Sequence, residues 1–206
     1  MVIIYVMSKR VIEDADKRIL RATIKLGGSS NPNKDFSTKD IAAESGVSEF
    51  LIFSRYKNKT NLMQEADSYC YTLVRSGAKT IANNVIRVPD FINAFLDWLL
   101  VHPEIVYFTL NYGHGVPHVE EIPLKDEKTY LSKRMEDADY FFNHFKTKGT
   151  FAYLVMWDHL LKTLLYSAGS LLSHEYPDSP DFRNHLCTLV DKGLNSLHAK
   201  ETPLHG

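Results

Sequence analysis

Apolar residues recur every three or four positions along most of this 206-residue chain, which is the spacing that gathers them on one face of an α-helix. The first stripe predicts a helix over residues 9–26, with apolar positions at Val11, Ile12, Ala15, Ile19, Ala22 and Leu26. Residues 27–33, GGSSNPN, hold two glycines and a proline, so the helix is expected to end there. Phe36 is the expected apolar plug before the next helix.

Residues 38–62 predict two short helices joined by a tight turn. Thr38 is the expected N-cap of the first helix, in which Ile41, Ala42 and Ala43 supply an apolar side. Gly46 suits the positive φ of a turn, Val47 is expected in the core, and Ser48 is expected to cap a second helix that ends near Tyr56. Two short helices joined by a glycine-containing turn form the unit that places one helix in the DNA major groove.

The rest of the chain also predicts helix, so the expected fold class is all-α. Further helices are expected from residue 58 or 60 to 83, and over residues 89–101, 103–112, 125–146, 151–173 and 181–200, with a loop over 113–123. The segment 151–173 is apolar on nearly every side, and 181–200 carries a second strong stripe. Such helices must be covered on both sides, which favours dimerisation through these two segments. The alternative is that they simply form the core of a monomer.

The segment 38–62 resembles the DNA-binding region of TetR-type bacterial transcriptional regulators. The matching residues are Thr38, Ile41-Ala42, Gly46-Val47-Ser48, Phe53, Lys59 and Leu62, preceded by Ile19-Leu20-Arg21-Ala22. The resemblance implies an N-terminal three-helix DNA-binding domain over residues 1–58 and a helical ligand-binding and dimerisation domain over 59–206. It also implies a homodimer paired through 151–173 and 181–200, a double-stranded operator with two-fold symmetry, and a small-molecule effector that relieves repression.

Charge is distributed unevenly along the chain. Residues 1–60 contain eleven Lys or Arg and seven Asp or Glu, a net charge of +4, whereas residues 61–206 carry −5. A positive N-terminal part suits a polyanionic partner, and the remainder has no such character.

By position in the motif, the residues expected at DNA are Thr38, Lys39, Ser48, Glu49, Phe50, Leu51, Phe53, Ser54, Arg55, Lys57 and Lys59. The resemblance makes Lys59 a phosphate contact, and Lys9 with Arg10 is expected to form an additional basic arm. The second helix departs from its relatives, which commonly have a small residue and Thr at the positions of Phe50 and Leu51, and often Tyr at the position of Phe53. Glu49 can serve only by accepting from a cytosine amino group, whereas Phe50 and Leu51 can pack on thymine methyl groups.

Fifteen of the 24 aromatic residues fall between Phe91 and Tyr166, which favours a host for a flat, largely apolar ligand, although most of these rings are expected to fill the core. The expected lining is Trp98, Phe108, Tyr112, Tyr130, Phe142 and Trp157.

Other chemistries find little support in the sequence. His114 and His118 have the spacing of a zinc pair on a helix, but Gly113, Gly115 and Pro117 disfavour a helix there, so no metal site and no cofactor are predicted. No catalytic constellation or phosphate-binding loop occurs, so an enzyme is not expected. No run reaches the length of a membrane span, and the two separated cysteines are expected to be reduced thiols in a cytoplasmic protein.

Two functions are left to separate. The first is a TetR-like repressor. The second is a dimeric helical module that has kept this fold to bind a ligand or a protein but has lost specific DNA binding, an alternative sustained by the atypical residues Glu49, Phe50, Leu51 and Phe53.

Overall fold

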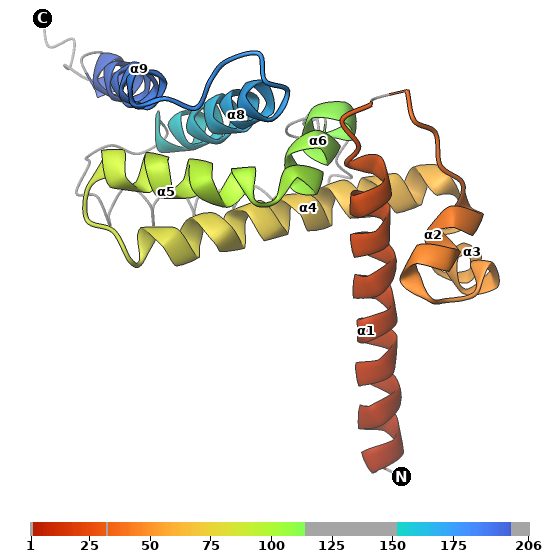
Figure 1. Ribbon diagram of the computed structural model, residues 1–206. Coiled ribbons are helices and arrows are strands. Elements are labelled where there is room, and N and C mark those ends of the chain that lie inside the picture. The colour runs from red at the N-terminus through yellow and green to blue at the C-terminus, as the bar shows by residue number, and fades with distance from the viewer. Residues whose placement is uncertain (1, 32, 114–151, 199–206) are drawn as a thin grey trace, which may run out of the picture. The chain divides into compact units, whose positions relative to one another are not determined.

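A computed structural model describes residues 2–31, 33–113 and 152–198, and the side chains of 14–31, 33–113 and 159–193. The fold is all-α, as predicted, and Figure 1 shows the helices in chain order. Their bounds are α1 Val2–Gly27, α2 Thr38–Ser45, α3 Glu49–Tyr56, α4 Lys59–Ala82, α5 Val88–Leu100, α6 Pro103–Tyr112, α8 Ala152–Leu172 and α9 Pro180–His198. Of these described helices, none combines the length and apolar character needed to cross a membrane.

The predicted helix boundaries are confirmed to within two residues for α2 to α6, α8 and α9. Helix α1 differs because it begins at Val2, so Lys9 and Arg10 lie inside a helix. The apolar run before Lys9 extends the predicted helix toward the N-terminus, and whether Lys9 and Arg10 reach DNA as a basic arm stays a prediction. The helix predicted over 125–146 and the loop over 113–123 lie, beyond Gly113, outside the described residues.

The chain divides into two compact units. The first comprises Met1–Val74 and Pro103–Gly113, and the second comprises Arg75–His102 and His114–Gly206. Helix α4 thus contributes to both units, and α6 returns to the first. The predicted functional division after residue 58 stays a prediction, since a unit that packs together need not coincide with a domain that binds DNA.

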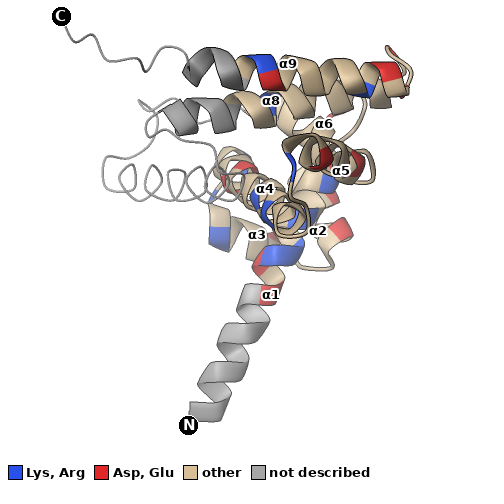
Figure 2. Ribbon diagram, turned by 90° about the vertical axis from the view of Figure 1, so that its left-hand side faces the viewer, with Lys and Arg blue, Asp and Glu red and all other residues tan. Residues whose placement is uncertain are grey.

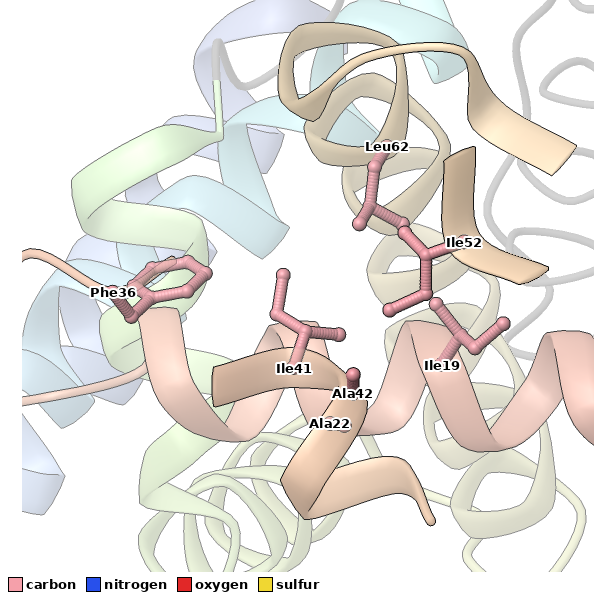
Figure 3. Packing of buried hydrophobic residues seen from close by; sticks show 7 residues of the cluster. All are labelled: Ile19, Ala22, Phe36, Ile41, Ala42, Ile52 and Leu62. Carbon is pink, nitrogen blue, oxygen red and sulfur yellow. The ribbon is translucent and has the colours of Figure 1, made fainter. Parts of the chain in front are cut away.

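The core of the first unit joins four helices and the segment that precedes α2. Its buried members are Ile19, Ala22, Phe36, Ile41, Ala42, Ile52 and Leu62. Figure 3 shows the side chains of Ile19, Ile52 and Leu62 converging from α1, α3 and α4. All three are at most 1% exposed, so burial of apolar surface fixes these helices together.

Helix α6 is joined to α1 by close backbone approach. A Cβ added at Gly28 would lie 2.1 Å from the carbonyl oxygen of Glu104, so only glycine fits there. The Asn111 amide donates to the carbonyl oxygens of Gly27 (3.4 Å) and Ser29 (3.0 Å). These contacts seat α6 against the end of α1.

The second unit is built around α5, which contacts α8 and α9. Successive rings stack along α5, with centroid distances of 5.5 Å for Phe91–Phe95, 5.6 Å for Phe95–Trp98 and 4.3 Å for Trp98–His102. Arg183 of α9 forms ion pairs with Asp178 (2.6 Å) and Asp97 of α5 (2.7 Å). Hydrogen bonding, first to Asp178 and then to Asp97, raises the pKa of Arg183, so this charge is fixed between α5 and α9.

Candidate nucleic-acid interface

Helix α2 begins with a reciprocal capping box. The Ser37 hydroxyl accepts from the Asp40 backbone N–H, and the Asp40 carboxylate accepts from the Ser37 backbone N–H at 2.7 Å. These hydrogen bonds, first of all the one from the Ser37 backbone, lower the pKa of Asp40. The prediction of Thr38 as N-cap was wrong by one residue. The missed signal was the Ser37-x-x-Asp40 spacing, which is the sequence signature of this box.

The turn between α2 and α3 depends on Gly46, as predicted. Its φ of 66° and ψ of 34° lie in the left-handed region, and its N–H donates to the Ala42 carbonyl. Arg18 of α1 donates to the Ser45 carbonyl at 3.1 Å, so the end of α2 is held from a third helix. Val47 packs against the buried cluster in the place expected for it.

Helix α3 has one buried face and one exposed face. Ser48 is confirmed as its N-cap, because its hydroxyl accepts from the Leu51 N–H. Ile52 is buried, and Tyr56 is half-buried against the cluster, where desolvation raises the pKa of its phenol to about 12. The exposed face carries Phe50, 82% exposed, and Phe53, 45% exposed, followed by Ser54 and Lys57.

Residues 50, 53 and 54 follow the i, i+3, i+4 spacing of one helix face, and Lys57 follows the helix as its C-cap. Leu51, expected at the DNA, lies between the two faces and is only partly exposed. The Lys57 ammonium group donates to the Ser54 carbonyl at 3.3 Å, at the C-terminal end of α3.

Glu49, at the first position of α3, is bonded within the protein. Its carboxylate accepts from the Thr38 hydroxyl at 2.5 Å, which joins the first residues of α2 and α3. Both side chains were expected at DNA, and the structure brings them together. One of the two Glu49 carboxylate oxygens, which were expected to accept from a cytosine amino group, thus accepts from Thr38 in this conformation.

Lys59 is held by three groups of the segment before α2. Its ammonium group is 3.0 Å from the Asp35 carboxylate, donates to the Phe36 carbonyl oxygen, and lies 4.4 Å from the centroid of the Phe36 ring. The hydrogen bond from Lys59 is the main cause that lowers the pKa of Asp35. Sequence reasoning missed Asp35, since the motif contains no signal that couples these two positions across 24 residues.

Arg55, at the end of α3, lies close to α1. Its guanidinium is 3.6 Å from one carboxylate oxygen of Asp16, and the other oxygen of Asp16 is buried without a hydrogen bond among the described atoms. Lys39 and Lys57 are exposed on the same unit. In Figure 2, the described parts of α1 to α3 carry segments of both signs of charge.

The residues predicted to line a ligand pocket divide between several places. Phe108 and Tyr112 contact each other in the first unit, with ring centroids 5.4 Å apart, and Tyr112 also meets Phe36. Trp98 belongs to the second unit, where its ring covers Gly77 so closely that a Cβ added to this glycine would lie 2.8 Å from the ring. Tyr130, Phe142 and the side chain of Trp157 lie outside the described residues, so the pocket stays a prediction.

No metal site is found among the side chains that are described: no three His, Cys, Asp or Glu gather there. His114 and His118 fall outside this range. Cys70 is buried, which raises the pKa of its thiol to about 12, and its sulfur lies 3.5 Å from the Thr109 hydroxyl.

No family model matches the chain, and no curated protein matches it. Several chains of known structure are similar to it, among them two transcription regulators. A TetR family transcription regulator from Marinobacter aquaeolei VT8 shares 11% identity with a TM-score of 0.59. A TetR-like transcriptional regulator from Rhodococcus sp. RHA1 shares 12% identity with a TM-score of 0.53. In both cases the match covers 88% of this chain and 96% of the other. At these identities the similarity establishes that the chain has the fold of these regulators.

Proposed function

We propose that this chain is a TetR-like, DNA-binding transcriptional regulator. The observation that carries the proposal is the α2–Gly46–α3 unit, in which both helices are capped, the turn has the required left-handed glycine, and α3 turns one face outward. In helix-turn-helix proteins the second helix lies in the major groove with its N-terminal residues nearest the base edges. The similarity to two TetR-type regulators supports this assignment.

The protein acts as a homodimer that pairs through residues 151–173 and 181–200. Tyr166 of α8, a largely apolar helix, is 66% exposed, and Leu189 of α9, which carries an apolar stripe, is 62% exposed. A second copy would cover these side chains. Its operator then has two-fold symmetry, with half-sites about one helical turn or a multiple of it apart.

The regulator is a cytoplasmic repressor, released from its operator when a small, largely apolar ligand fills a site in residues 59–206. The concentration of aromatic residues between Phe91 and Tyr166 supports this part of the proposal. The DNA-binding domain is residues 1–58, and the residues that approach DNA are those of the α2–α3 unit together with Lys57 and Lys59.

One observation favours a second function. Glu49 and Lys59 are engaged inside the protein, and Phe50 presents an apolar ring at the place where hydrogen-bonding residues usually read bases. A dimeric module that keeps the fold and binds a ligand or a protein, without specific DNA binding, would have these features.

A gel-shift titration separates the two functions. The full chain is titrated against the duplex that flanks its own gene and against random duplex of equal length, each at several salt concentrations. Sequence-selective binding that weakens steeply with salt supports the regulator. Equal binding to both duplexes would favour the second function.

A further inference from the structure

Two aromatic rings stand on the outward face of α3. Phe50 and Phe53 are three residues apart and therefore lie on the same side of the helix, at 82% and 45% exposure. Phe50 is in the first turn, the part of such a helix that comes nearest to base edges.

Three charged groups around these rings are engaged within the protein, whereas Ser54 adds an exposed hydroxyl to the same face. The Glu49 carboxylate accepts from Thr38, the Arg55 guanidinium is turned toward Asp16, and the Lys57 ammonium donates to the end of its own helix. The described geometry thus leaves the rings as the most prominent feature of the α3 surface.

The major groove offers one principal apolar feature, which is the C5-methyl group of thymine. Guanine, adenine and cytosine present donors and acceptors there, and a phenyl ring can satisfy none of them. A ring pressed against such groups leaves them without hydrogen bonds, which is costly, whereas a ring pressed against a methyl group removes apolar surface from water.

We propose that α3 recognises its DNA through thymine methyl groups packed against Phe50 and Phe53, with Phe50 as the main specificity-determining residue. The proposal rests on the DNA-binding function proposed above. Double-stranded DNA is the occupant that the charge favours, because residues 1–60 carry a net +4 and the exposed Lys39 and Lys57 lie on the elements beside the rings.

The test removes the methyl groups and nothing else from the base edges. Duplexes are enriched from a random-sequence pool with the full chain and then amplified twice, once with thymidine triphosphate and once with deoxyuridine triphosphate. Uracil pairs as thymine does but lacks the methyl group. We expect the uracil duplexes to bind about fourfold more weakly for each contacted thymine, which is the effect of one buried methylene-sized group expressed as a ratio of Kd.

Matched variants assign the effect to the rings. Phe50→Ala should bind thymine and uracil duplexes nearly equally, and Phe53→Ala should show a reduced difference. Ile86→Ala is the control, because Ile86 is 89% exposed and lies outside the helix-turn-helix, so this variant should discriminate like the unaltered chain. Circular dichroism and thermal unfolding verify that each variant is folded.

Each other outcome is informative. Equal binding of thymine and uracil duplexes by the unaltered chain would overturn the thymine proposal and leave the regulator intact. Discrimination by Phe50→Ala as large as that of the unaltered chain would also overturn it, since the methyl groups would then be read elsewhere. Failure to enrich any duplex, with binding equal to that of random DNA, would overturn the DNA-binding function itself, and the ring pair would then belong to a protein interface.

Discussion

The two faces of the helix-turn-helix follow different rules. The inner face, formed by Ile41, Ile52 and the residues that contact them, buries the motif's apolar residues, whereas Ala43, also expected on the apolar side, is exposed. The outer face, from Glu49 to Phe53, departs from that motif and carries an aromatic ring at 82% exposure. The inner face must satisfy only the packing of this chain, whereas the outer face must satisfy a partner. Sequence similarity to a fold class therefore predicts the residues of the inner face but not those of the outer face.

The most direct way to test this contrast is to shorten one side chain on each face. Ile52→Ala removes a side chain that is 1% exposed and leaves a cavity, so the free energy of unfolding should fall by about 2–5 kcal/mol. Phe50→Ala removes a larger side chain that touches little, and the free energy of unfolding should change by less than about 0.5 kcal/mol. Urea denaturation followed by circular dichroism measures both.

The contrast would fail if Phe50→Ala destabilised the fold as much as Ile52→Ala. Phe50 would then be a packing residue, and its ring would not be available to a partner. Ile86→Ala, at 89% exposure, serves as a control for a change at an exposed apolar residue elsewhere.

The turn that orients the two faces gives the next largest effect. Gly46→Ala places a Cβ at φ 66°, where an L-residue is strained by about 1–2 kcal/mol. The nearest side-chain atom, Nη1 of Arg18, would be 3.5 Å away, so the cost is conformational rather than steric. Gly46→Asn, which tolerates this backbone region better, should recover part of the loss in the same denaturation assay. Equal losses in the two variants would instead indicate a steric origin.

Neighbouring hydroxyl groups at the start of α2 should differ in their contribution. Ser37→Ala removes the side chain of the capping box and should cost about 1 kcal/mol. Thr38→Val removes no cap but does remove the hydroxyl that donates to Glu49, so the two variants are compared in a Glu49→Ala background, where Thr38→Val should cost clearly less. Thermal unfolding distinguishes them, and the reverse order in that background would restore Thr38 as the cap.

The sequence predicted the architecture well because its signals are local. A Gly at a turn, a Ser before a helix and apolar residues at helical spacing each act through nearby backbone, so α2 to α6 ended close to where they were expected. The capping box was also local, and the choice of Thr38 over Ser37 overlooked Asp40. The start of α1 was missed because the chain offers no stop signal between Val2 and Lys9.

The site was harder to predict because its side chains are placed by residues far away in the sequence. Glu49 is engaged by Thr38, Arg55 by Asp16 and Lys59 by Asp35. None of these partners follows from the spacing of a motif, since each depends on how separate helices pack. The sequence could predict which positions face outward. It could not predict which charged side chains at those positions are paired within the protein.

Lys59 tests whether a residue of this unit contacts the DNA, as the outer face does, or stabilises the fold, as the inner face does. If it binds a phosphate, as the resemblance implies, Lys59→Ala should weaken binding similarly on all duplexes and lower the slope of log K against log salt concentration by about one. Asp35→Asn should strengthen binding, because the ammonium group then faces a phosphate without a competing carboxylate. The gain should vanish in the double variant, as expected for a pair that acts together.

If Lys59 instead stabilises the fold, the same variants should behave differently. Lys59 also donates to the Phe36 carbonyl and lies over its ring, so it can stabilise the segment before α2 without touching DNA. In that case Lys59→Ala would lower the unfolding temperature and leave the salt slope unchanged, and Asp35→Asn would not strengthen binding. Anisotropy titrations at four or more salt concentrations decide whether Lys59 contacts DNA or stabilises the fold. Lys39→Ala is the reference for an exposed lysine at the start of α2.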